Sequence, residues 1–191
     1  ATHEREILFV KNRFVLVRDE TTFDDSFRAM IGPIWITQNV GNPCGTQWLN
    51  TWFSAHTFQA AELYRTPPWD LLIYYAPHPG AKLTVAESPE QTPAASQLCA
   101  TRYAWEGDVK PGTRLQFVTV LLPHAPLPDA SPLAQGIEVL ADRPGLAAVK
   151  IAQDGRCELA ILNPEGAMFD ADTRVAGGLT TDARAAYLDL T

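Results

Sequence analysis

The chain has 191 residues, a length that suits one large β domain or two small ones. Of these residues 46% are hydrophobic and 19% are charged, a composition that excludes a disordered protein. The formal net charge of −7 argues against nucleic acid as a partner, although a local basic cluster could still bind an acidic sugar. No apolar run is long enough to span a bilayer.

Short apolar runs separated by turn residues dominate the chain. The first two runs, residues 6–10 and 13–17, flank Lys11 and Asn12 and predict a β-hairpin. Further strands are expected, in chain order, at residues 27–31, 34–40, 48–58, 71–76, 82–86, 97–105, 114–122, 136–141, 146–152, 157–162 and 185–190. Residues 58–64 and 132–135 could each form a turn of helix.

Many short strands at this spacing predict an all-β fold, an antiparallel β-sandwich of supersandwich-like type with very little helix. The 15 prolines fit strand ends and loops better than helix interiors. The proline-rich stretch 123–132 is expected to be a surface loop. Residues 1–191 are therefore expected to form a single β-sandwich domain.

The predicted strand 48–58 carries an unusual face. Side chains alternate between the two faces of a strand, so its even positions mix two tryptophans with polar residues: Trp48, Asn50, Trp52, Ser54, His56 and Phe58. Two interpretations stay open. The face is either half-buried with its polar atoms satisfied by neighbours, or it forms part of a site.

Four stretches of the sequence carry a resemblance to a known family. They are the pair of runs Thr2–Val10 and Phe14–Asp19, the strand that ends at His56, the run 115–124 and the run 178–187. Together they resemble the C-terminal β-sandwich region of the heparinase II/III-like polysaccharide lyases, which follows a large α-helical toroid. The resemblance is loose but spans most of the chain.

The resemblance implies a larger bacterial parent protein, secreted or periplasmic, that cleaves an acidic polysaccharide by β-elimination. The chain starts abruptly in strand-like sequence, so we expect it to be a fragment that lacks the N-terminal α-toroid domain. In the family that helical domain, the expected partner of this chain, supplies the catalytic tyrosine and much of the substrate cleft. The chain alone is therefore expected to be inactive.

The resemblance also implies a zinc ion held by two histidines and one aspartate. The matching positions here are His3, Asp19 and His56. A three-residue hairpin loop centred on Lys11 would pair His3 with Asp19, whereas a two-residue turn would move Asp19 onto the other face. The alternative is a solvated His3, an Asp19 that caps a turn and a His56 that is hydrogen-bonded within the sheet. Such a zinc ion would organise the sandwich rather than perform chemistry.

Candidate substrate-binding residues lie elsewhere in the sequence. Arg102 and Tyr103 could pair with a sugar carboxylate and stack on its ring, against the alternative of ordinary cross-strand packing. His78, between two prolines, could line a binding groove or be an exposed loop residue. His124, at the end of a strong strand, is expected at a rim. The sequence contains no nucleophile elbow, Walker loop or dinucleotide fingerprint, and it singles out no catalytic residue.

Two other functions remain open beside the lyase domain. A non-catalytic carbohydrate-binding module would present an exposed row of tryptophans, because sugar rings stack on flat indoles. A structural adhesion domain would present a large exposed apolar patch.

Overall fold

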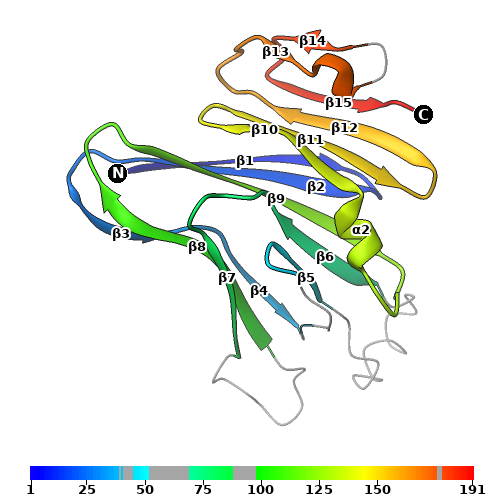
Figure 1. Ribbon diagram of the computed structural model, residues 1–191, viewed down its shortest axis with the longest axis horizontal. Coiled ribbons are helices and arrows are strands. Elements are labelled where there is room, and N and C mark those ends of the chain that lie inside the picture. Colours follow the sequence, from blue (N-terminus) through cyan, green and yellow to red (C-terminus); the bar gives the residue numbers. More distant parts are fainter. Residues whose placement is uncertain (39, 41–44, 52–68, 88–97, 176–177) are drawn as a thin grey trace.

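The computed structural model describes residues 1–38, 40, 45–51, 69–87, 98–175 and 178–191 (Figure 1). Of these described residues 63% are β-strand, in antiparallel sheets with one short α-helix among them, which confirms the predicted all-β sandwich-like fold. In chain order the elements are β1 (Thr2–Val10), β2 (Phe14–Thr22), β3 (Phe27–Ile31), β4 (Ile34–Gln38), β5 (Trp48–Thr51), β6 (Asp70–Tyr75), β7 (Lys82–Glu87), β8 (Leu98–Val109), β9 (Arg114–His124), α2 (Ser131–Gln135), β10 (Ile137–Arg143), β11 (Leu146–Gln153), β12 (Arg156–Leu162), β13 (Phe169–Asp170), the 3₁₀ turn η1 (Asp172–Arg174), β14 (Thr180–Thr181) and β15 (Ala185–Asp189).

The described strands form three main sheets. The central sheet has the order β1-β2-β9-β6-β5, the C-terminal sheet the order β10-β11-β12-β15, and the β8 sheet has β3 and β4 on one side of β8 and β7 on the other. Figure 1 shows the central sheet between the other two. The short pair β13-β14 lies beside the C-terminal sheet.

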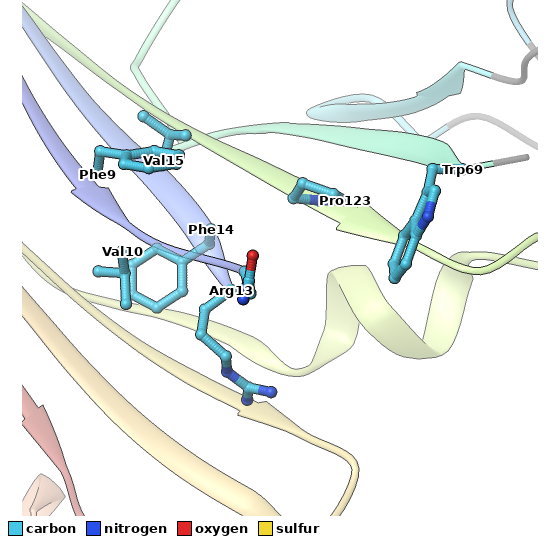
Figure 2. Close-up of a pocket in the computed structure, with 8 residues that line it drawn as sticks. Phe9, Val10, Arg13, Phe14, Val15, Trp69 and Pro123 are labelled. Carbon is cyan, nitrogen blue, oxygen red and sulfur yellow. The ribbon is translucent and has the colours of Figure 1, made fainter. Parts of the chain in front are cut away.

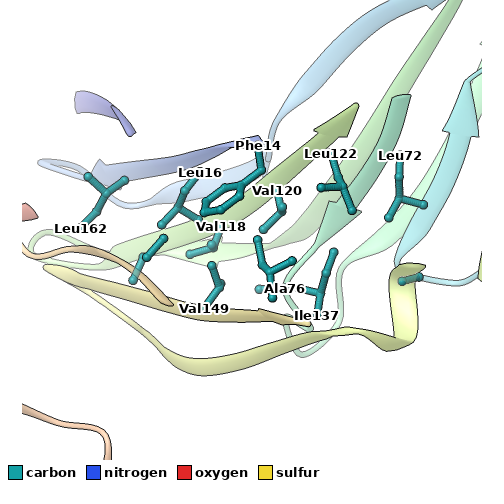
Figure 3. Packing of buried hydrophobic residues seen from close by; sticks show 14 of the residues in the cluster. Phe14, Leu16, Leu72, Ala76, Val118, Val120, Leu122, Ile137, Val149 and Leu162 are labelled. Carbon is teal, nitrogen blue, oxygen red and sulfur yellow. The ribbon is translucent and has the colours of Figure 1, made fainter. Parts of the chain in front are cut away.

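The inner strands β2, β6 and β9 of the central sheet are buried on both faces, and most of their side chains are apolar. Even-numbered residues of β2, β6 and β9, among them Leu16, Leu72 and Val120, pack against β10, β11 and β12 (Figure 3). Odd-numbered residues such as Ile73 and Phe117 pack on the opposite face, against the β8 sheet. Each layer of core removes large apolar side chains from water, which is the main force that holds the three sheets together.

The link between β3 and β4 lies very close to β8. A Cβ added at Gly32 would lie 1.9 Å from the backbone oxygen of Tyr103, so only glycine fits there. This close approach sets Ile31 and Ile34 beside the start of the β1–β2 hairpin, where a hollow opens.

Most of the predicted strands are confirmed within the described residues. The predicted strand 48–58 is seen as β5 over Trp48–Thr51, and the rest of it, with the possible helical turn 58–64, lies outside the described residues. The turn of helix expected at 132–135 is α2. The two-residue strands β13 and β14 were not predicted, because two residues are too few to show an alternating pattern.

Candidate functional site

The β1–β2 hairpin places four polar side chains on one face of the central sheet. Val10 pairs with Phe14 across a turn centred on Asn12, so His3 lies opposite Thr21 and Arg5 lies opposite Asp19. The turn has three residues, as one of the two alternatives required, but its centre is Asn12 rather than Lys11, so His3 lies two residues from a direct pairing with Asp19. An offset of two keeps both side chains on the same face, so they are diagonal neighbours.

His3 and Asp19 approach each other closely. His3 Nε2 lies 3.4 Å from Asp19 Oδ1, and His3 Nδ1 lies 2.9 Å from Thr21 Oγ1. The His3 side chain is 54% exposed, whereas that of Asp19 is 4% exposed. The threonine hydroxyl thus fixes the imidazole ring and leaves Nε2 facing the carboxylate.

Arg5 holds the Asp19 carboxylate from the neighbouring strand. Its Nε donates to Oδ1 at 2.6 Å and its Nη2 donates to Oδ2 at 3.0 Å, which is the two-pronged geometry of strong charge-assisted pairs. The guanidinium carbon also lies 5.3 Å from the ring centroid of Trp35, within cation–π range. The hydrogen bond to Asp19 raises the Arg5 pKa, and burial offsets only part of that effect.

These residues line a hollow of about 260 Å³ between the hairpin and the β3–β4 link. His3, Arg5, Asp19 and Thr21 form its polar wall, and the remaining lining is mostly apolar, with Phe117 on the central sheet. The hollow therefore presents an imidazole, a guanidinium and a carboxylate at one place, which suits a polar or charged ligand.

The His3–Asp19 pair fits two positions of a zinc site. Zinc bonds of about 2.0–2.2 Å at the tetrahedral angle place two ligand atoms about 3.4 Å apart, and the two donor atoms are 3.4 Å apart here. Arg5 takes one lone-pair direction on each Asp19 oxygen, and each oxygen offers two. Within the described residues no three His, Cys, Asp or Glu side chains gather as metal ligands would. The third expected ligand, His56, lies outside the described residues.

The candidate substrate-binding residues do not share one surface. Arg102 is exposed on the outer face of β8, where its Nη1 contacts Met30 Sδ at 3.4 Å, while Tyr103 points to the opposite face and is 2% exposed. Tyr103 stacks on Tyr75 with ring centroids 4.9 Å apart, and burial raises its pKa. Arg102 and Tyr103 therefore reach different sides of the β8 sheet.

His78 does meet Tyr103. Its backbone N–H donates to the Tyr103 hydroxyl at 3.0 Å, and its ring stacks on Phe117 at a centroid distance of 4.9 Å. His78, for which a groove-lining position and an exposed loop position were both open, is thus half-buried against the core beneath the β8 sheet.

His124, expected at a rim, is buried with an exposed fraction of 3%. Its Nδ1 donates to the carbonyl oxygen of Ala125 at 2.7 Å, and its Nε2 lies 2.8 Å from Asn50 Oδ1. Asn50 Nδ2 in turn donates to Asp70 Oδ2 at 3.4 Å. Asn50, on the polar face predicted for the strand that begins at Trp48, therefore belongs to a buried cluster whose polar atoms hydrogen-bond with one another.

A buried ionic network on the opposite face of the hairpin was missed by the sequence analysis. Arg18, with an exposed fraction of 0%, donates to Glu20, to Glu6 at 3.0 Å and to Gln116 at 2.6 Å. Glu20 also accepts from Arg114 Nε at 2.6 Å and from the Gly145 N–H at 2.8 Å. The network connects β1, β2 and β9 to the β10–β11 turn and so fixes the strands that carry His3 and Asp19.

The tryptophans do not form an exposed row in the described part of the chain. Trp35, Trp48 and Trp105 are half-buried against the cores, whereas Trp69 is 57% exposed. Trp52 lies outside the described residues. Among the described helices, none combines the length and apolar character that crossing a membrane requires.

Comparison with known proteins adds no relative. No known family profile, no curated protein and no solved structure matches the chain.

Proposed function

We propose that the chain is the β-sandwich domain of a polysaccharide lyase of the heparinase II/III-like kind, whose secreted or periplasmic parent acts on an acidic polysaccharide. The domain braces the helical catalytic domain and forms one wall of the substrate cleft. The observation that carries the proposal is the hollow in which His3 and Asp19 face each other 3.4 Å apart beside Arg5. The sequence resemblance, which implies the positions His3 and Asp19, also supports it.

The proposed role follows from what the hollow contains. β-Elimination beside a uronate requires a base, a group that neutralises the carboxylate and an acid for the leaving oxygen. At this wall a zinc ion held by His3 and Asp19 would supply the positive charge for an anionic sugar, because Asp19 already compensates the charge of Arg5. The other groups are assigned to the helical domain, so the chain by itself is proposed to be inactive.

His3 and Asp19 would hold a zinc ion in this hollow, with His56 as the third expected ligand. Such an ion would supply positive charge and join neighbouring strands, which stabilises the fold around it. The chain's own contribution is the second layer of contacts, in which Thr21 orients the His3 ring and Arg5 orients the Asp19 carboxylate.

The lyase assignment is tested by activity of the parent. Full-length protein should release unsaturated uronates from heparan sulfate or alginate, seen as new ultraviolet absorbance, and residues 1–191 alone should not. Activity of the isolated chain, or a parent protein that cleaves no acidic polysaccharide, would contradict the proposal.

Zinc is tested separately. Metal analysis of the purified chain should find about one zinc per chain, as for a single site, and His3→Ala or Asp19→Ala should lose it. Asp182→Ala is the control for Asp19→Ala, because it removes an exposed carboxylate that does not line the hollow. A metal-free protein whose stability is unchanged by EDTA would remove the zinc site from the account.

A non-catalytic carbohydrate-binding module is the second candidate. The exposed indole of Trp69 favours it. It predicts oligosaccharide binding by the isolated chain together with an inactive parent.

A further inference from the structure

One edge of the central sheet presents a continuous exposed line of side chains. His3, Arg5, Ile7 and Phe9 occupy alternate positions of β1 and so lie on the same face. Ile7 is 58% exposed and Phe9 is 68% exposed, unusual values for large apolar residues. The line leads from the His3–Asp19 hollow to the far end of β1, and the rise of a strand places Phe9 about 13 Å from Arg5.

A second hollow, of about 320 Å³, opens at that far end. Figure 2 shows Phe9 and Trp69 at its two ends, with Pro123 between them and Arg13 below. Val15 pairs with Phe9 across the hairpin and continues the same face. The hollow is lined mainly by apolar side chains, and two of its aromatic rings are exposed to solvent.

The polar groups of this hollow come from Asn12 and Arg13. Asn12 sits in the tight β1–β2 turn with a φ of 61°, a conformation that asparagine tolerates better than most residues. Arg13 donates to Glu158 from Nε at 2.9 Å and from Nη2 at 2.5 Å, so its charge is already compensated. The hollow therefore offers flat rings, an amide and a neutralised guanidinium, rather than a net charge.

That combination matches a sugar ring. The C–H face of a pyranose stacks on an indole or phenyl ring, and its hydroxyl groups exchange hydrogen bonds with amide and guanidinium groups. An anion would find no net positive charge there, because Glu158 already compensates the charge of Arg13. A hollow of this size is at the lower end of the range for small-ligand sites.

We propose that this second hollow is an oligosaccharide subsite in which Trp69 stacks on one sugar ring, and that the chain of sugars continues along β1 towards His3 and Arg5. The inference rests on the proposed function, because that function supplies the polymer and its direction. The subsite itself contacts the uncharged face of the sugar. It should therefore contribute to binding of acidic and neutral oligosaccharides alike, whereas the His3–Asp19 hollow should favour acidic ones.

The test is calorimetric titration of residues 1–191 with three hexasaccharides, from heparan sulfate, alginate and cellulose. Trp69→Ala should weaken binding about tenfold, which corresponds to about 1.4 kcal/mol. Trp69→Phe keeps a ring and should retain most of the affinity. Met168→Ala removes an apolar side chain that is 63% exposed elsewhere and should leave affinity unchanged. Because Trp69 and Met168 are both exposed, these variants should fold.

The outcomes separate the subsite from the lyase assignment. If Trp69→Ala binds oligosaccharides more weakly, while the parent is inactive and the chain binds no zinc, the subsite is supported and the lyase assignment is refuted. Binding that is lost in His3→Ala but unchanged in Trp69→Ala overturns the subsite alone. The subsite is also overturned if Trp69→Ala converts a dimer into a monomer in analytical ultracentrifugation while sugar affinity stays the same, because the hollow would then be an interface between copies of the chain.

Discussion

Removal of the Glu20 charge should destabilise the protein far more than removal of a surface charge. The Glu20 side chain is 4% exposed and accepts from Arg18, whose side chain is 1% exposed, and from Arg114. Glu20→Gln keeps the shape of the side chain but leaves two guanidinium groups without their shared carboxylate. Breaking a buried ion pair by removing one partner costs about 3–5 kcal/mol.

A loss of that size is easily measured. For a domain of this length about 4 kcal/mol corresponds to a fall in Tm of about 10 °C, and the urea midpoint should fall with an unchanged slope. The control is Glu106→Gln, which breaks the Arg28–Glu106 pair with side chains 70% and 54% exposed; exposed pairs contribute about 0–1 kcal/mol. If Glu20→Gln lost no more stability than this control, the network would not hold the hairpin as argued.

Three further predictions concern pH and metal binding. Burial raises the Asp142 pKa, so the folded state binds that proton more tightly than the unfolded state does, and the free energy of unfolding falls as the pH rises through the folded pKa. Asp142→Asn should therefore be more stable than the wild type at neutral pH in urea titrations. A less stable variant would contradict this prediction. Burial would raise the Glu158 pKa, but hydrogen bonds from Arg13 and Tyr187 outweigh burial and lower the pKa. The stabilisation that Glu158 contributes is therefore present above its unfolded pKa and lost as the pH falls through its folded pKa, so Arg13→Gln should flatten the stability curve between about pH 5 and pH 2. An unaltered curve in that range would count against the Arg13–Glu158 pairing. Thr21→Val removes the contact that orients His3 and should weaken zinc affinity about tenfold in a chelator competition; equal affinity would show that the threonine does not position the ring.

The strands were predictable from the sequence because their alternation is local. The Lys11–Asn12 turn and the apolar runs around it identified the first hairpin correctly. The register was not predictable, because it depends on whether the turn spans two or three residues and on which residue lies at its centre. The central position turned out to be Asn12, and the two-residue offset still left His3 and Asp19 on one face.

The buried charges were not predictable for a different reason. Arg18 and Glu20 lie in a strand whose charged residues look solvent-exposed in a two-layer sandwich. In the fold a third sheet covers that face, so both side chains are buried with their partners from distant strands. Long-range pairing of this kind leaves no pattern in a single sequence. Likewise, His124 gave no sign that Asn50, 74 residues away in sequence, would meet it in the core.

The most direct test of the central claim is an anomalous diffraction map recorded at the zinc absorption edge from crystals grown with zinc. The account predicts one strong peak within bonding distance of His3 Nε2 and an Asp19 carboxylate oxygen, absent in crystals of Asp19→Ala. A hollow without a peak, or a zinc ion bound by other residues, would contradict the account.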